Sequence, residues 1–316
     1  MKEIGGYMEL DTYGLPMRHE GAVALNCGRN ALAYLIEARN IKQICLPRFL
    51  CSSVEDVCRK LGVRVRHYQI TAEFKPVVPQ LYEEEWLYLV NYYGQLSREF
   101  LEKIVLEYPR TIVDNAQHYF SDPIPGVDTI YTCRKYFGVP DGAFLYTDTV
   151  LNRELSVDES CTRMSFVLGR YERTATEFYR ESAANNRFFA GEPVKKMSRL
   201  TWNLLHGIDY EAVRKRREEN FRILDEGLKG KNRLVVRMAE GAFMYPFLTE
   251  DAEKVREKLI EHRVYIPVLW PNVLTDCNEG TAEYRLAKNI LPLPCDQRYD
   301  ADDMITVLSY VNSILY

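Results

Sequence analysis

The sequence predicts an α/β protein with a large domain built on a mostly parallel sheet, followed by a smaller α+β domain. From residue 22 to residue 148, short apolar runs alternate with amphipathic segments of helical periodicity. This pattern is typical of a parallel sheet with helices on both faces. With 316 residues and 47% hydrophobic content, the chain can bury such a core. We expect a three-layer large domain over residues 1–229 and a small C-terminal domain over residues 230–316.

Local signals place the elements of the large domain in order. The expected helices begin at polar caps or glycine turns and end near glycine or proline; they cover residues 29–40, 52–62 and 97–109. The expected strands are apolar, and some alternate with period two; they cover residues 22–26, 41–47, 63–70, 84–94, 110–117, 127–133 and 142–148. Ligands of such sheets bind just beyond the carboxyl ends of the strands.

The rest of the chain changes character. Residues 151–229 are charged and helical in pattern, and they include a long amphipathic helix over residues 210–228. The small domain is expected to contain two paired strands (233–238 and 243–249), a helix (251–263), a further strand (264–271) and a closing helix (300–315).

Composition narrows the classes of function. The formal net charge is −4 and there is no basic run, so we expect no nucleic-acid partner. No apolar stretch reaches the roughly 20 residues that a membrane helix needs, and the first ten residues lack the apolar region of a signal peptide. We therefore expect a cytoplasmic protein without membrane contact. The eight cysteines and five histidines show no C-x-x-C pair and no zinc spacing, so no metal site is expected.

Three expected strand ends carry residues of chemical interest, and the first is the run LNCGRNAL over residues 25–32. A strand enters a glycine turn that opens a helix, which leaves unpaired backbone N–H groups that attract an anion. Taken alone, a plain turn that needs Gly28 for its backbone angles is the commoner explanation.

The other two strand ends carry Asp114 and Lys135. A carboxylate at the position of Asp114 either caps a turn or helix, which is the commoner use, or pairs with a cationic ring nitrogen. A lysine is rarely buried without a partner. Lys135 therefore either extends its ammonium into water or forms a Schiff base with an amine whose pKa is lowered by desolvation.

Together the three features match the needs of one cofactor, pyridoxal 5′-phosphate. It requires an anion site for its phosphate, a carboxylate that keeps its ring nitrogen protonated, and a lysine that holds its aldehyde. Asp114 and Lys135 are 21 residues apart, which is one connection and one strand. Two neighbouring strand ends would then direct both side chains at one ring.

On these residues the sequence resembles the fold-type I pyridoxal-phosphate enzymes, and among them the DegT/DnrJ/EryC1/StrS family of sugar aminotransferases. NCGRNAL is similar to the family's phosphate loop, usually Ser-Gly-Thr followed by Ala-Leu, and VDNAQH is close to its Glu-Asp-Ala-Ala-Gln-Ala motif. LVNYYGQ resembles Val-His-Leu-Tyr-Gly-Gln, and RKYFGVPDGAFLYT resembles the lysine segment. The resemblance runs nearly end to end and implies an aspartate-aminotransferase-like large domain.

The resemblance implies a role for each matching residue. Lys135 would hold the cofactor aldehyde as an imine and move a proton between the substrate α-carbon and the cofactor. Asp114 would pair with the ring nitrogen, and Gln117 would hydrogen-bond the ring hydroxyl or help to position the ring. The remaining cofactor-binding candidates are Cys27, Gly28, Arg29, Asn91 and Thr132.

Several positions depart from the family pattern. Arg29 replaces the usual threonine of the phosphate loop, where a guanidinium would bind the phosphate or reach a substrate carboxylate. Asn91 stands where the family often has histidine. The family's serine five residues before the lysine is Ile130 here, whereas Thr132 resembles the Ser-x-x-Lys hydroxyl of the wider fold. The chain is also shorter than typical members, so loops that bind the sugar nucleotide are expected to be reduced.

Two further features of the family stay open. Members stack an aromatic ring on the cofactor, and the candidates for that contact are Phe49, Cys51 at the aligned position, Tyr92 and Tyr93. Members also form homodimers with shared active sites, in which a partner asparagine reaches the phosphate. Asn185 or Asn186 would supply it, although both also suit a solvated helix end.

We therefore expect a pyridoxal-phosphate-dependent aminotransferase. The expected amino donor is an amino acid such as glutamate, and the expected acceptor is a keto compound such as a nucleotide-linked keto sugar. The alternative is a non-catalytic or regulatory protein that keeps the fold and the cofactor. An acyl-transfer pair of Thr132 and Lys135, of the S-x-x-K kind, lacks the other motifs of that chemistry.

Overall fold

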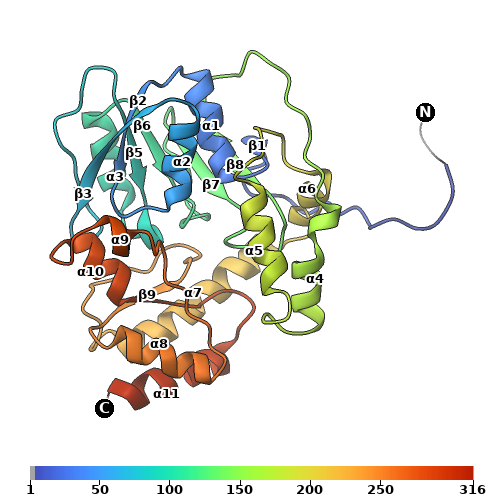
Figure 1. Ribbon diagram of the computed structural model, residues 1–316. Helices are drawn as coiled ribbons and strands as arrows, with labels where there is room; N and C mark the ends of the chain where they lie inside the picture. Colours follow the sequence, from blue (N-terminus) through green and yellow to red (C-terminus); the bar gives the residue numbers. More distant parts are fainter. Residues whose placement is uncertain (1–3, 316) are drawn as a thin grey trace.

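The computed structural model describes residues 4–315 (Figure 1) and arranges them around one large sheet and one small sheet. The large sheet has the order β1-β8-β7-β6-β5-β2-β3-β4, and the small sheet pairs β9 with β10. Their bounds are β1 Val23–Leu25, β2 Gln43–Pro47, β3 Arg64–Ile70, β4 Pro76–Val77, β5 Trp86–Val90, β6 Thr111–Asp114, β7 Asp128–Thr132, β8 Ala143–Tyr146, β9 Tyr245–Leu248 and β10 Ile290–Leu293.

Most strands of the large sheet are parallel, and this confirms the predicted fold class. Strands β2, β3, β5, β6 and β7 pair in parallel, whereas β8 is antiparallel to both of its neighbours and β4 is antiparallel to β3. The connections from β1 to β2 and from β2 to β3 cross the sheet towards its β4 edge, whereas the connection from β5 to β6 crosses it in the opposite direction. Because such crossovers are right-handed, the first two helices cover one face and the third covers the other.

The helices occupy the expected positions in the first half of the chain. Their bounds are α1 Gly28–Ala38, α2 Ser52–Lys60, α3 Arg98–Glu107, α4 Ser165–Glu172, α5 Tyr179–Phe188, α6 Arg199–Leu205, α7 Tyr210–Leu228, α8 Ala252–Glu261, α9 Val273–Asp276, α10 Ala282–Asn289 and α11 Ala301–Leu315, with 3-10 turns η1 Tyr92–Gly94 and η2 Cys161–Arg163. Among residues 4–315, no helix combines the length and apolarity needed to cross a bilayer.

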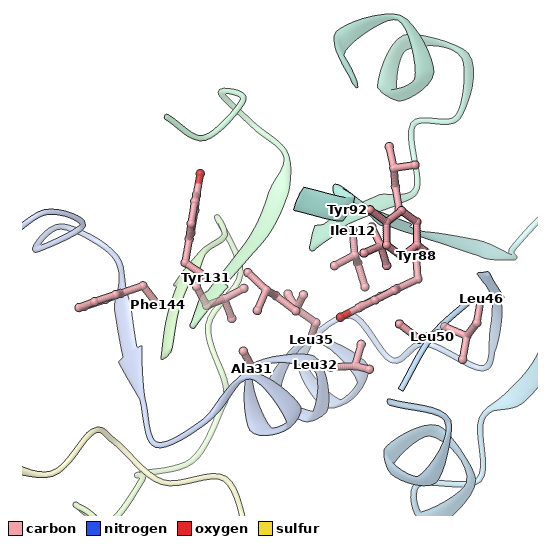
Figure 2. Close-up of a cluster of buried hydrophobic side chains, with 14 of the residues drawn as sticks. Ala31, Leu32, Leu35, Leu46, Leu50, Tyr88, Tyr92, Ile112, Tyr131 and Phe144 are labelled. Atoms are coloured by element: carbon pink, nitrogen blue, oxygen red, sulfur yellow. The ribbon is translucent and has the colours of Figure 1, made fainter. Parts of the chain in front are cut away.

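The main core lies between α1 and the large sheet. Figure 2 shows Leu32 and Leu35 of α1 beside sheet side chains such as Ile112. Leu32 and Leu35 are 1% and 0% exposed, so the burial of each contributes roughly 1.5–3 kcal/mol. This packing holds the start of α1 over the carboxyl ends of the strands.

A second core joins α7 to the C-terminal elements. Phe221, Leu224 and Leu228 of α7 are buried with side chains from β9, β10, α8 and α11. The long helix predicted over residues 210–228 therefore contributes to the packing of the C-terminal part of the chain. The division into domains at residues 229 and 230 stays a prediction.

The expected pairing of residues 233–238 with residues 243–249 is wrong. Residues 245–248 form β9, but its partner is β10, and residues 233–238 form no strand. Val235 is fully exposed, whereas Arg237 donates to the carbonyl oxygens of Gly94, Gln95 and Leu96. Side-chain bonds to another loop thus replace the expected strand ladder.

Two other strand predictions also need correction. Residues 264–271 contain no strand, because Pro267 and Pro271 lack backbone donors and Trp270 has a φ of 58°. The strand expected over residues 84–94 ends at Val90, since Tyr93 adopts a left-handed φ of 52° that a strand does not tolerate.

Candidate active site

The carboxyl ends of β5, β6 and β7 meet at one edge of the sheet. In the parallel register, Asp114 lies opposite Val90 of β5 and Ile130 of β7. Thr132 is two residues beyond Ile130 and therefore projects to the same face as Asp114. The turn that follows β7 carries Lys135, so the structure brings these predicted residues to one edge.

Lys135 is open to solvent on one side and surrounded by protein on the others. Its side chain is exposed, and its Nζ lies 5.7 Å from the ring centroid of Phe243. The surrounding protein displaces water from the ammonium and lowers the pKa of Lys135, whereas electrostatic attraction by Asp114 and Cys51 acts in the opposite direction. More of this amine is therefore neutral at a given pH than for a lysine in water.

The Asp114 carboxylate is buried and held by two donors. Tyr88 Oη donates to Oδ2 over 2.9 Å, and the Ala116 N–H donates to Oδ1 over 2.8 Å. Tyr88 lies opposite Ile112, which places it diagonal to Asp114 on the same face of the sheet. Burial raises the pKa of Tyr88 well above its usual value, so the hydroxyl remains a donor. Sequence reasoning missed Tyr88, although a hydroxyl within the apolar run of residues 86–90 was a signal.

Gly28 lets the start of α1 approach the end of β7. A Cβ on Gly28 would lie 2.7 Å from Thr132 Cγ2, which is closer than such carbon atoms pack. Its φ is not in the left-handed region, so close approach, rather than special backbone angles, requires glycine here. Cys27 occupies the N-cap without a side-chain capping bond, which leaves N–H groups of the first turn for other acceptors.

Two arginines meet beside the start of α1. Arg29 Nη1 donates to the carbonyl oxygen of Asn186 over 3.2 Å, and Arg134 Nη2 donates to Asn186 Oδ1. Burial and the nearby charges of Arg29 and Arg163 lower the pKa of Arg134 to about 10. Sequence reasoning missed Arg134, although its position next to Lys135 was a signal.

Asn185 and Asn186 make their bonds within their own chain. Asn185 Nδ2 donates to the Pro140 carbonyl oxygen over 2.8 Å, and Asn185 Oδ1 accepts from Arg163 Nη1 over 3.2 Å. Asn186 accepts from the two arginines described above. An asparagine that serves a second subunit stays a prediction.

Gln117 and Asn91 fix the turn after β5. Gln117 Oε1 accepts from the Tyr93 N–H over 2.8 Å, which leaves its Nε2 as the end available to a ligand. Asn91 is fully buried; its Nδ2 lies 3.1 Å from both Asn115 Oδ1 and His118 Nδ1, and its Oδ1 accepts from the Leu96 N–H. The polar atoms of Asn91 are thus engaged in the turn rather than with Lys135.

Three of the four candidates for ring stacking belong to the buried core. Phe49 packs edge-on against Trp270 with ring centroids 4.5 Å apart, and it also contacts Tyr92. Tyr93 is 1% exposed. Cys51 is only half-buried and acts electrostatically on Lys135. The aromatic ring recorded beside Lys135 is instead Phe243, which sequence reasoning missed because it lies far along the chain.

Comparison with known proteins places the fold. No family model and no curated protein matches the sequence. Solved structures do match: an aminotransferase described as DegT DnrJ EryC1 StrS from Brucella abortus has a TM-score of 0.63 at 14% identity, covering 93% of this chain and 86% of that chain. The sugar aminotransferase CalS13 from Micromonospora echinospora has a TM-score of 0.62 at 16% identity, covering 92% and 87%.

This chain has the fold of these sugar aminotransferases. NtdA from Bacillus subtilis, whose structure holds the cofactor PMP, also matches, with a TM-score of 0.66 at 14% identity over 93% of this chain and 73% of that chain. Within residues 4–315, no cluster of three or more His, Cys, Asp or Glu side chains is placed to hold a metal ion.

Proposed function

We propose that the protein is a pyridoxal-phosphate-dependent aminotransferase. The observation that carries the proposal is the meeting of Lys135 and Asp114 at neighbouring strand ends of this fold, beside the open N-terminus of α1. Relatives in fold bind this cofactor in its amine form.

The residues present fit the cofactor. Gly28 lets the first turn of α1 lie against Thr132, so the open N–H groups of that turn and the Thr132 hydroxyl would bind the phosphate together. Arg134 Nε is buried without an acceptor, which is the kind of donor that a bound anion satisfies. Gly28 and Arg29, the first two residues of α1, would supply backbone N–H groups to the phosphate, next to the N-cap Cys27.

The contacts of Asp114, Gln117 and Asn91 support a role for each of them near the cofactor ring. Asp114, held by Tyr88 and Ala116, would keep the ring nitrogen protonated. Gln117 would donate from its Nε2 to the ring hydroxyl. Asn91 would stabilise the turn that follows β5. When bound, the cofactor supplies an electron sink for charge that develops at the substrate α-carbon.

Lys135 would be the catalytic residue. Its Nζ would bind the cofactor covalently at rest and, once released, would take the proton from the α-carbon of the amino donor. Both tasks need a neutral amine, and the lowered pKa of Lys135 favours that form.

The finer assignments belong to the same proposal. An amino acid such as glutamate would be the donor, and a nucleotide-linked keto sugar would be the acceptor. A relative in fold, CalS13, is named a sugar aminotransferase, which supports a sugar as the acceptor. We also propose a homodimer with shared active sites, located in the cytoplasm.

The test is an absorbance spectrum of the purified protein with added pyridoxal 5′-phosphate, followed by borohydride reduction and peptide mapping. The expected result is a cofactor fixed on Lys135, with none fixed at that site in Lys135→Ala. Release of a keto acid from added amino acids would then establish turnover. A protein that fixes the cofactor but never consumes an amino donor would favour the regulatory alternative, and one that never binds it would end the proposal.

A further inference from the structure

We propose that Arg29 and Arg134 form a paired guanidinium site for a phosphate monoester dianion, with Asn186 as the residue that positions both. The inference deepens the proposed function, because the phosphate in question is that of the cofactor. The same chemistry would bind free inorganic phosphate, which allows the site to be tested without the cofactor ring.

The charge balance around the start of α1 supports an anion. Arg163 is paired with Asp158 over 2.6 Å, and Lys195 with Glu192 over 2.5 Å. Arg29 and Arg134 form no ion pair with any described residue of the chain. Neither guanidinium is therefore neutralised by a salt bridge with these residues, and a phosphate monoester carries about −1.5 to −2 at neutral pH.

The geometry directs the two guanidinium groups at one place. Arg29 is the second residue of α1, and Arg134 follows β7, whose end approaches α1 because Gly28 has no side chain. Both arginines donate to oxygens of the same residue, Asn186. A planar guanidinium presents N–H donors in a fixed geometry that matches phosphate oxygens. Two guanidinium groups that are both bonded to Asn186 therefore form a preorganised anion site.

Two buried donors on residues near the start of α1 lack an acceptor in the part of the chain that the structure describes, and one of them belongs to Arg134. Arg134 Nε and Asn26 Nδ2 are both buried, and neither has an acceptor within residues 4–315. Asn26 is fully buried and lies immediately before the N-cap of α1. Arg134 is also held from one side, because its Cζ lies 5.0 Å from the ring centroid of Phe189. A buried donor without an acceptor is costly, and an oxygen of a bound anion would remove that cost.

The role of Asn186 follows from its neutrality. Its two oxygens orient the arginines without cancelling their charge, and the residue is exposed, so an anion can enter from solvent. An aspartate of the same shape would place a carboxylate against Arg134, the arginine that the side chain of Asn186 contacts, and would compete with the phosphate. This makes Asn186→Asp a sharper test than a truncation.

The experiment measures the Kd of inorganic phosphate by calorimetry, and the Kd values of pyridoxal 5′-phosphate and of pyridoxal by absorbance. The variants are Arg29→Gln, Arg134→Gln and Asn186→Asp. The matched control is Arg187→Gln, because Arg187 is an exposed arginine next to Asn186 in α5. We expect each of the three variants to weaken both phosphate ligands by about 10- to 100-fold. We expect the Kd of pyridoxal to stay within twofold of its value for the unaltered protein in all three variants. In the Arg187→Gln control, we expect the Kd values of all three ligands to stay within twofold.

The outcomes separate the inference from the proposed function. Phosphate binding that depends on the arginines, in a protein that does not fix pyridoxal 5′-phosphate on Lys135, would support the anion site and overturn the aminotransferase proposal. A cofactor fixed on Lys135 with phosphate affinity unchanged in the arginine variants would overturn the paired site alone. Equal losses for pyridoxal and for pyridoxal 5′-phosphate would also overturn it, since the effect would not depend on the phosphate.

Discussion

Only the neutral amine of a lysine attacks an aldehyde, so the pKa of Lys135 would set the pH at which the proposed cofactor attaches. Desolvation lowers that pKa from 10.5, and electrostatic attraction by Asp114 and Cys51 limits the shift. As the pH rises through the lowered pKa, ammonium converts to amine and attachment accelerates. We therefore expect the rate of borohydride-trapped attachment of pyridoxal 5′-phosphate to rise with pH to a plateau with a midpoint below 10.5. Lys135→Ala measures the background from other amines, and a midpoint at or above 10.5 would contradict the prediction.

The bond from Tyr88 to Asp114 gives a second single-residue test. Tyr88→Phe removes the donor of the 2.9 Å bond and leaves Oδ2 of a buried carboxylate without that partner. Bonds to charged groups contribute about 1.5–3 kcal/mol, so we expect a loss of that size in the free energy of unfolding at pH 7, measured with urea. Tyr171→Phe is the control, because Tyr171 is 92% exposed and surface changes stay within about 0.5 kcal/mol. Equal losses in the two variants would refute the role of this bond.

Among the elements, those defined by local pattern were predictable and those defined by tertiary contact were not. β6 and β7 are short apolar runs that end at polar residues, so the sequence placed them and their end residue Asp114 correctly. Residues 233–238 have an equally apolar pattern but are held by the bonds of Arg237 to a distant loop. No local signal reveals such a contact.

The same distinction holds for the candidate site. Asp114 and Lys135 follow recognisable strands, and both were expected from the sequence. The contacts of Tyr88, Arg134 and Phe243 depend on strand register and on how separate segments meet. Those relations exist only once the sheet and the C-terminal elements have packed, so spacing along the chain does not disclose them.

The junction between α1 and β7 can be tested with a double-mutant cycle. Gly28→Ala would place a Cβ 2.7 Å from Thr132 Cγ2, so the start of α1 must move away, at a cost of about 1–3 kcal/mol in unfolding free energy. Thr132→Ser removes Cγ2 but keeps the hydroxyl. We expect the double variant to recover most of the loss, as measured by urea unfolding. Gly191→Ala is the control, because nothing lies near its added Cβ. Strictly additive losses would show that the two residues do not meet.

Acid stability reports on the packed chain as a unit, because two buried histidines must stay neutral within it. His19 Nε2 lies 2.7 Å from the Tyr119 carbonyl oxygen, and its ring stacks on Tyr131 with centroids 4.1 Å apart. His118 Nδ1 lies 3.1 Å from Asn91 Nδ2, and its Nε2 is buried without a partner among the described residues. Burial lowers the pKa of each histidine to about 4.

The direction of the pH effect follows from proton binding. Between pH 6.5 and about 4 the unfolded chain binds protons at these histidines and the folded chain does not, so stability falls as the pH falls through this window. A shift from 6.5 to about 4 corresponds to about 3 kcal/mol for each histidine. Their contribution is fully present above pH 6.5 and levels off below pH 4.

His118→Gln tests this coupling, because the amide oxygen keeps an acceptor for Asn91 while the titrating group is lost. We expect the variant to lose less unfolding free energy than the unaltered protein when the pH falls from 7 to 4.5, with a difference of about 2.4 kcal/mol. Urea unfolding at a series of pH values measures it, and carboxyl groups cancel because both proteins share them. Parallel profiles would mean that the folded chain binds a proton at His118 as readily as the unfolded chain does, and would contradict the prediction.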